Sequence, residues 1–184
     1  MLERTSATTE QIKKFFRKGI YFFLEIGILL MVSACAYHMV PAPCYIQDGE
    51  LAKVTTEHRV SLVNDQPRTG EKELGVHWNG DFNQFADTAI IVLKDALGKN
   101  DVIIINDADK LIKLSVNSAS VNMEFWDFRA DISLKVETGS GLRKDFTGYQ
   151  IYAFGAQSTW AMERAITYAV MEILKDPDIL SYLK

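Results

Sequence analysis

The sequence contains few of the residues that usually carry catalysis or hold metal ions. It has two cysteines and three histidines among its 184 residues. His38, His58 and His77 lie in separate segments, without the spacing that places two metal ligands on one face of a helix. No serine stands in the pattern of a nucleophile elbow, and Cys44 has no neighbouring base. We therefore predict that the protein is not an enzyme and that it holds neither a metal ion nor a cofactor.

Loops that bind phosphate or calcium are also poorly represented. The stretch TGSG at 138–141 stands beside Arg143 and Lys144. It lacks the strand-to-helix setting of a phosphate-binding loop, so we expect a hairpin turn there. Asp107 and Asp109 could offer oxygen ligands to a hard cation, but their positions match no EF-hand loop. The pattern favours a polar turn between strands.

The charge balance is acidic. The formal net charge is −4, and removal of residues 1–34 would leave 15 basic and 21 acidic residues, a net charge of −6. A chain of this kind offers no basic surface for nucleic acid. It would not bind an anionic bilayer through charge either. We predict no nucleic-acid partner, and any attachment to a membrane has to come from apolar groups.

The first 34 residues have the three parts of a secretory signal, namely a positive flank, an apolar segment and small residues before a cleavage site. Cys35 then follows Val32, Ser33 and Ala34, a pattern similar to the signals of bacterial lipoproteins, in which the cysteine is acylated and becomes the first residue. We predict that Cys35 carries the lipid. Several buried acyl chains are sufficient for stable membrane attachment. The basic residues of the flank are Lys13, Lys14, Arg17 and Lys18.

Two other interpretations of this segment remain open. A single membrane-spanning helix over about residues 20–40 would be long enough to cross a bilayer, and it would place the protein in the inner membrane. That helix would hold Glu25 and His38 in or near hydrocarbon, which is costly. The segment could also be a buried helix of the main domain. If Cys35 is lipidated, Ala36 in the next position favours the outer membrane in enterobacterial-type sorting.

Residues 35–50 have two prolines, few charges and no periodicity, which indicates a tether or an irregular lead-in strand. Removal of the signal would leave Cys44 as the second of two cysteines, with Cys35 occupied by lipid. Cys44 would then be free, buried in local packing or paired with another chain. We favour the first two states.

Residues 51–184 are predicted to form a single domain. Alternating apolar residues over 54–62 predict a strand, and a shorter alternation over 74–78 predicts a second one. The apolar spacing over 82–97 predicts a helix that is capped by Asp81 and Gln84 and ended by a left-handed Gly98. The aliphatic run 101–105 is typical of a buried strand, joined to the first by a parallel right-handed crossover.

The second half of the chain is mainly extended. Apolar positions change parity between residues 116 and 119, which predicts a bulge or a sharp bend around Asn117 and Ser118. Strands over 128–136 and 142–154 are expected on either side of the TGSG turn. A helix capped by Ser158 or Thr159 should run to Pro177. The expected fold class is α+β, with one mostly antiparallel sheet and two amphipathic helices packed on one face.

Phe125 and Trp126 are expected at a hairpin tip. Large aromatic side chains in that position are candidates for contact with a partner protein or a lipid surface. The alternative is that both rings fold back and close the end of the core.

The chain resembles the YajG-like group of small bacterial lipoproteins. The resemblance lies in the order of elements and in two short stretches, LAKVT at Leu51 to Thr55 and RADISLKV at Arg129 to Val136. It implies a periplasm-facing lipoprotein of the outer membrane with an α+β domain. Neither stretch is a catalytic motif, so the resemblance implies no active-site residue.

These observations predict a lipid-anchored, non-enzymatic lipoprotein that binds or scaffolds an envelope protein complex. The alternative is an auxiliary lipoprotein or carrier of a transport system for envelope lipids or small molecules. An apolar groove between the sheet and its helices would favour the carrier.

Overall fold

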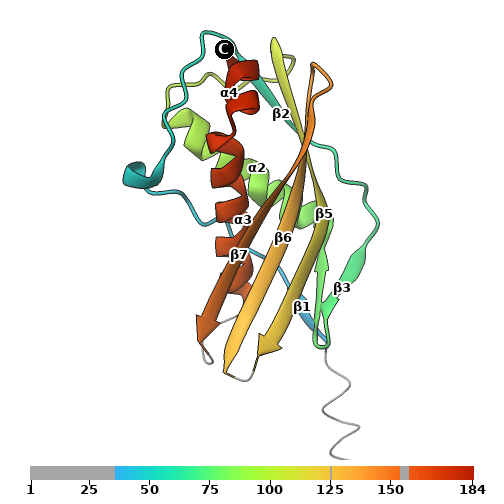
Figure 1. Cartoon of the computed structure of the whole chain (residues 1–184). Coiled ribbons are helices and arrows are strands. Elements are labelled where there is room, and N and C mark those ends of the chain that lie inside the picture. Colours follow the sequence, from blue (N-terminus) through green and yellow to red (C-terminus); the bar gives the residue numbers. More distant parts are fainter. Residues whose placement is uncertain (1–35, 125, 154–157) are drawn as a thin grey trace, which may run out of the picture. The chain divides into compact units, whose positions relative to one another are not determined.

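The computed structural model describes residues 36–124, 126–153 and 158–184. Two residues singled out from the sequence, Cys35 and Phe125, lie outside this part of the chain. The described residues form two sheets and three α-helices (Figure 1). The α+β class predicted from the sequence is therefore confirmed.

The larger sheet has the strand order β2-β5-β6-β7. Strands β5, β6 and β7 pair antiparallel, whereas β2 runs parallel to β5. Helix α2 lies over β2 and β5, and helix α3 lies over β6 and β7. The bounds are β2 Val60–Asn64, β5 Lys110–Glu124, β6 Asp127–Thr138, β7 Arg143–Ala153, α2 Phe82–Gly98 and α3 Ser158–Lys175.

A second, smaller sheet was not predicted. It has the order β1-β4-β3, with bounds β1 Tyr37–Met39, β3 Glu71–Gly75 and β4 Trp78–Asp81. The alternation over 74–78 was expected to be one strand, but the chain turns there into a β3–β4 hairpin, and Val76 in the turn is 83% exposed. A β-carbon on Gly75 would lie 2.2 Å from the carbonyl oxygen of Val121, so this hairpin packs directly on β5.

The lead-in segment before β2 is fixed on the helices. Met39 and Ile46 are buried, with exposed fractions of 0% and 1%. The segment crosses from α2 to α3 and back, and each helix bonds its backbone. The bonds run from Thr88 Oγ1 to the Pro41 carbonyl at 3.1 Å, from the Ala42 amide to Glu163 Oε1 at 3.0 Å, from Thr167 Oγ1 to the Cys44 carbonyl at 2.7 Å, and from Lys99 Nζ to the Ile46 carbonyl at 2.8 Å. Within the segment 35–50, residues 37–39 form strand β1 and residues 40–46 are irregular chain bonded to both helices.

Helix α2 begins as predicted and ends differently. The Asp81 carboxylate accepts a hydrogen bond from the Asn83 amide at 2.9 Å. Gln84 Oε1 is buried without a hydrogen-bond partner among the described residues, so the reciprocal half of the capping box does not form. Gly98 is the last helical residue but not a left-handed one, because the positive φ of 61° falls at Asp101.

The predicted strand over 101–105 is reduced to one parallel bridge between Val60 and Ile104. The parallel partner of β2 is instead the first part of β5, which begins at Lys110. Residues 54–58 are likewise not a strand. Their backbone is held by side chains, since the Val54 amide donates to Asn100 Oδ1 at 3.0 Å and Thr56 Oγ1 donates to the Leu183 carbonyl.

The predicted bulge in β5 is confirmed. The pairing with β6 shifts by one residue between Val116 and Ser118. Ile112, Leu114 and Val116 face the core before the shift and Val121 faces it afterwards, so the extra residue restores the apolar side of the strand.

The chain ends in a short third helix, α4, Pro177–Leu183. Asp176 caps it by accepting hydrogen bonds from the amides of Asp178 and Ile179, both at 3.0 Å. Pro177 occupies the first turn, where a missing N–H costs nothing. The proline predicted to end α3 therefore also begins α4.

Candidate functional site

Strand β7 has a free edge. It is the last strand in the order of the larger sheet, so one side of its backbone has no partner strand among the described residues. Edge strands of stable proteins are usually protected by proline, charged residues or bulges. From Phe146 to Ala153 the strand has no proline and no charged residue, and its pairing with β6 shows no shift. This edge is therefore open to another extended chain.

The register identifies the backbone groups that point away from β6. The Thr138 amide donates to the Leu142 carbonyl at 2.9 Å, which makes that pair a hydrogen-bonded one. Hydrogen-bonded and non-hydrogen-bonded pairs alternate along an antiparallel ladder. The even-numbered residues of β7 thus bond β6, and the odd-numbered residues direct their N–H and C=O groups to the free edge. These residues are Asp145, Thr147, Tyr149 and Ile151.

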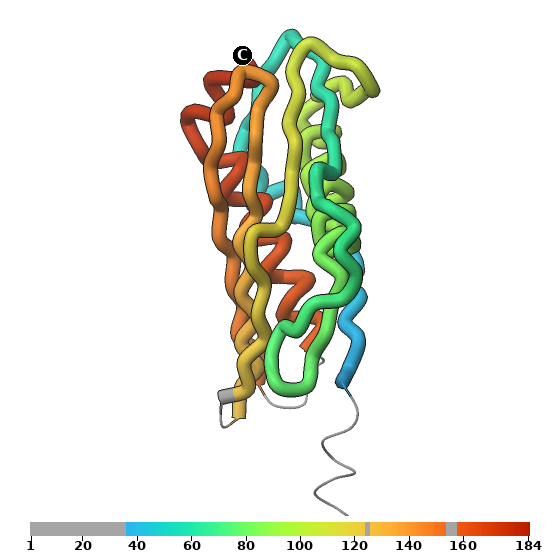
Figure 2. The backbone as a smooth tube through the Cα atoms, turned by 90° about the vertical axis from the view of Figure 1, so that its right-hand side faces the viewer, coloured from blue at the N-terminus to red at the C-terminus, as the bar shows by residue number. Residues whose placement is uncertain are grey.

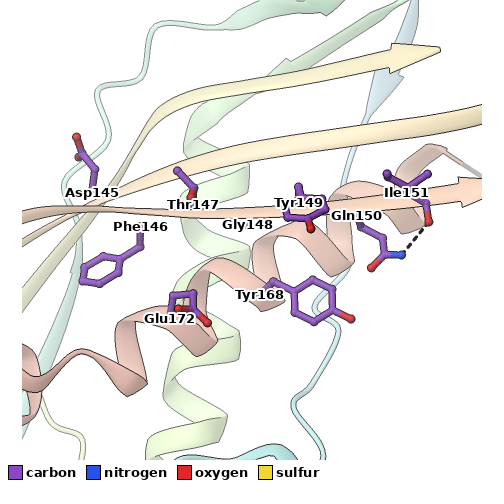
Figure 3. Close-up of a pocket in the computed structure, with 9 residues that line it drawn as sticks. All are labelled: Asp145, Phe146, Thr147, Gly148, Tyr149, Gln150, Ile151, Tyr168 and Glu172. Carbon is purple, nitrogen blue, oxygen red and sulfur yellow. Dashed lines mark hydrogen bonds between the residues drawn. The ribbon is translucent and has the colours of Figure 1, made fainter. Parts of the chain in front are cut away.

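A hollow of about 670 Å³ follows this edge (Figure 3). Residues 145–151 of β7 form one side, and Tyr168 and Glu172 of α3 form the other. Tyr149, Ile151 and Tyr168 are all exposed, at 58%, 45% and 41%. The hollow therefore combines backbone groups at the free edge with exposed apolar side chains, and one carboxylate, that of Glu172, stands on the helix side. Among these backbone groups the Ile151 carbonyl already accepts a hydrogen bond from Gln150 Nε2 at 2.8 Å. We call it the edge groove.

Helix α3 is held close to the strand by a glycine. A β-carbon on Gly148 would lie 2.0 Å from the Ala165 carbonyl oxygen and 2.5 Å from the Ala169 amide nitrogen. Ala165 and Ala169 are one helical turn apart and fully buried. The three small residues let the helix backbone approach the strand, so α3 forms a firm wall beside the free edge.

Arg164 joins β7, α3 and the lead-in segment. The pKa of its guanidinium is raised, first by electrostatic interaction with the nearby Cys44 side chain and then, against a cost of burial, by a hydrogen bond with the Tyr152 side chain. Cys44 is free and half-buried.

An ion pair fixes the N-terminal end of β7. Lys144 Nζ lies 2.8 Å from Asp176 Oδ2 and also contacts Asp178. Burial alone would raise the pKa of Asp176, but the bonds from Lys144 and from the Ile179 and Asp178 amides outweigh it and lower the pKa below its usual value. The beginning of β7 is therefore fixed to the junction of α3 and α4.

The residues considered as ligands lie apart. His38 Nδ1 pairs with Glu71 Oε1 at 3.1 Å, His77 stands in the β3–β4 turn, and His58 precedes β2. Asp107 adopts a positive φ of 57° in the loop before β5. In the ranges that the structure describes, no three His, Cys, Asp or Glu side chains gather as a possible metal site. The TGSG stretch forms the β6–β7 turn, with Gly141 at φ 88°.

Trp126 lies in the turn between β5 and β6 and is 67% exposed. It therefore projects from the tip, where the sequence placed it. Its neighbour Phe125 falls outside the described residues. The edge groove, in contrast, was not foreseen. The uncharged stretch from Phe146 to Ala153 was the signal that could have indicated it, but a sequence does not show which strand ends a sheet.

The chain is similar to chains of known structure, and not to a known family by sequence. No family model matches the sequence, and no curated protein matches it. A solved structure, that of protein XCC0632 from Xanthomonas campestris, assigned to the family DUF330, has a TM-score of 0.48 and 15% sequence identity. The match covers 76% of this chain and 93% of that chain. Within the described residues no helix is both long and apolar enough to cross a bilayer.

Proposed function

We propose that the protein is a non-enzymatic lipoprotein of the bacterial envelope, and that it binds an extended segment of an envelope protein along the edge groove. In this proposal Cys35 carries the lipid, and the domain faces the periplasm from the outer membrane. The protein then acts as a membrane-attached adaptor that holds a partner close to the bilayer.

The open edge of β7 carries this proposal. An extended peptide can add to such an edge as a further strand, with affinity from main-chain hydrogen bonds and specificity from pockets for alternate side chains. Asp145, Thr147 and Tyr149 supply outward N–H and C=O groups, and α3 supplies a rigid wall. Ile151 supplies its N–H, and an added strand would have to displace the Gln150 side chain from its carbonyl. An edge that is this long and uncharged is a hazard when left bare, which favours a use for it.

Membrane attachment is supported by the sequence before the domain. The positive flank, the apolar segment and the small residues end at Cys35, and β1 begins two residues later. The lead-in segment that follows is bonded to both helices. A lipid on Cys35 would therefore be coupled to a fixed part of the domain. The resemblance to the YajG-like lipoproteins, which lies in the sequence, supports the same membrane attachment.

Metabolic labelling tests the attachment. Cells that express the wild-type protein should incorporate a labelled fatty acid into it, and Cys35→Ala should incorporate none. Equal labelling of the two proteins would contradict the lipid anchor. Retention of the uncleaved Cys35→Ala protein in the inner membrane would not, because an unprocessed signal segment stays there.

Proline tests the edge. The Thr147 N–H points to the free edge, so Thr147→Pro removes a donor for an added strand without breaking a bond to β6. Thr147→Val is the matched control, since it keeps the N–H and removes the hydroxyl. A photo-crosslinking residue at Tyr149 should capture the same envelope protein in wild type and Thr147→Val, and much less of it in Thr147→Pro. Equal capture in all three would contradict strand addition.

The carrier function has weaker support. It would need an apolar space between the sheet and the helices, yet Gly148 contacts the α3 backbone, and the facing side chains Leu134, Ile166 and Val170 are fully buried. The edge groove opens to solvent beside the sheet. A lipid-extraction assay on the purified protein would favour the carrier if it recovered a bound lipid in a fixed ratio to protein.

A further inference from the structure

Four separate segments meet at one end of the domain. They are the start of β1, the β3–β4 turn, the β5–β6 turn and the start of α3. Trp78 contacts three of these segments. In the small sheet it pairs with Tyr37 of β1. Its ring stands edge-on to that of Phe128 in β6, with centroids 5.5 Å apart, and its Nε1 donates a hydrogen bond to Ser158 Oγ of α3 at 3.0 Å. Figures 1 and 2 show β1 beginning and the two turns reversing at the same end of the molecule.

This end displays an unusual number of apolar side chains. We call it the aromatic end and define it by its exposed residues, which are Tyr37 (56%), Val76 (83%), Met123 (55%), Trp126 (67%) and Trp160 (50%). The chain has three tryptophans, and all three belong to this end, since Trp78 is the residue at its centre. Tryptophan and tyrosine side chains are well suited to the interface between a membrane and water.

The covalent chain brings the same end to the bilayer. Only Ala36 stands between Cys35 and Tyr37, the first residue of β1. Two extended residues span at most about 7 Å. A lipid on Cys35 would therefore be held by the covalent chain within about 7 Å of the start of β1, which lies at the aromatic end.

We propose that the aromatic end is a second, non-covalent membrane contact, which inserts Trp126, Trp160 and their apolar neighbours into the headgroup region of the bilayer. The contact rests on the proposed function only for the attachment near Cys35. This contact sets the orientation of the domain on the membrane. A lipid attached at one point would leave the domain free to rotate, whereas apolar side chains from four segments inserted together would hold it in one orientation. The edge groove then faces the periplasm in a fixed direction.

The contact is apolar. With residues 1–34 removed the chain has a net charge of −6, and Asp127 stands exposed at the start of β6 beside Trp126. Anionic lipid would thus weaken the contact. The probe is therefore a vesicle of zwitterionic phosphatidylcholine, with and without bromine on its acyl chains, because bromine quenches tryptophan emission at short range.

The protein, purified from the membranes of cells that express the whole chain and reconstituted in these vesicles, should lose a large share of its emission in brominated lipid. The loss should shrink in Trp126→Phe and in Trp160→Phe, and fall in the double variant to the quenching of Trp78 alone. Ile103→Trp in the double-variant background is the control. Ile103 is 60% exposed and its carbonyl accepts from the Val60 amide, at the end where β5 begins. The 15 residues of β5 separate the two ends by roughly 45 Å.

The outcomes separate the two proposals. Quenching of Trp126, without quenching of the indole that Ile103→Trp introduces, supports the contact. No quenching, or equal quenching at both ends, overturns it, and a partner protein would then be the better occupant of this end. Mass spectrometry of the same sample shows whether Cys35 carries an acyl group. An acylated but unquenched protein overturns only the contact, whereas a quenched protein without an acyl group overturns only the lipid anchor.

Discussion

Gly148 of β7 lies against the backbone of Ala165 in α3, at a distance that leaves no room for a side chain. A β-carbon on Gly148 would stand 2.0 Å from the Ala165 carbonyl oxygen. Helix α3, which forms one side of the edge groove, can therefore lie this close to β7 because residue 148 has no β-carbon.

Gly148→Ala should consequently lower the free energy of unfolding by about 1–3 kcal/mol, the usual cost of overpacking a well-filled core. Urea denaturation measures the change. Gly98→Ala is the control, because a β-carbon there would meet no atom within 4 Å outside its own helix. It should be neutral, or stabilise the protein by up to about 1 kcal/mol through better helix propensity. Similar losses in both variants would contradict the close approach of α3.

The bulge in β5 gives a prediction about chain length. Deletion of Asn117 should convert the bulge into a regular ladder, in which Val116 still pairs with Leu134, Ser118 still pairs with Ser133, and Val121, which is 1% exposed, still faces the core. We expect this variant to keep a cooperative thermal transition, and loss of that transition would contradict the assignment of Asn117 as the inserted residue. Asn117→Ala keeps the residue count and changes only an exposed side chain. It should unfold within about 0.5 kcal/mol of the wild type.

Trp78 and Ser158 form a pair that a double-mutant cycle can measure. Trp78→Phe keeps an aromatic ring against Phe128 but removes the Nε1 donor, and Ser158→Ala removes its acceptor. Each change should destabilise the protein by about 1 kcal/mol through the lost hydrogen bond, and the double variant by less than the sum. Strict additivity would show that this bond does not join β4 to α3.

Asp176 makes stability depend on pH. Its pKa is lowered in the folded protein, so its contribution is present above the pKa of the unfolded state and is lost as the pH falls through the lower folded value. Asp176→Ala should cost about 1 kcal/mol at pH 7 through the lost helix cap. The difference from the wild type should shrink as the pH falls below about 4.

Asp176→Asn separates the two roles of this side chain. Asparagine caps a helix about as well as aspartate but cannot pair with Lys144 as a charge. This variant should retain more stability at pH 7 than Asp176→Ala, and its difference from the wild type should also shrink in acid. Denaturant titrations between pH 3 and pH 7 measure both effects. A difference that stays constant in acid would contradict the lowered pKa.

The elements with strong local patterns could be predicted from the sequence. The spacing in α2 and α3 and the uninterrupted alternation of β6 mark a buried face directly. The bulge at Asn117 could also be found, because a strand that changes parity and keeps one face buried needs an inserted residue or a sharp bend. Each of these signals comes from residues that lie close together in the sequence.

The features that depend on distant partners could not be predicted. Residues 101–105 have the composition of a buried strand, yet β2 takes its parallel partner from Lys110 onward. Asp101 in a left-handed conformation and the bond between Val54 and Asn100 reorganise that segment. The lead-in over 37–46 has no periodicity because its bonds go to α2 and α3, which follow more than 40 residues later. The edge groove depends on the order of strands, which no local pattern encodes.

The parallel pairing of β1 with β4 determines how the domain would respond to a mechanical load. Tension applied to the chain before Tyr37 would act along β1, whose three residues pair with Trp78, Asn79 and Gly80. Loading along the strand axis strains these bonds together in shear instead of opening them one at a time. Behind them Met39 is buried and Thr88 Oγ1 donates to the Pro41 carbonyl, so the domain is reinforced at the point where such a force would arrive.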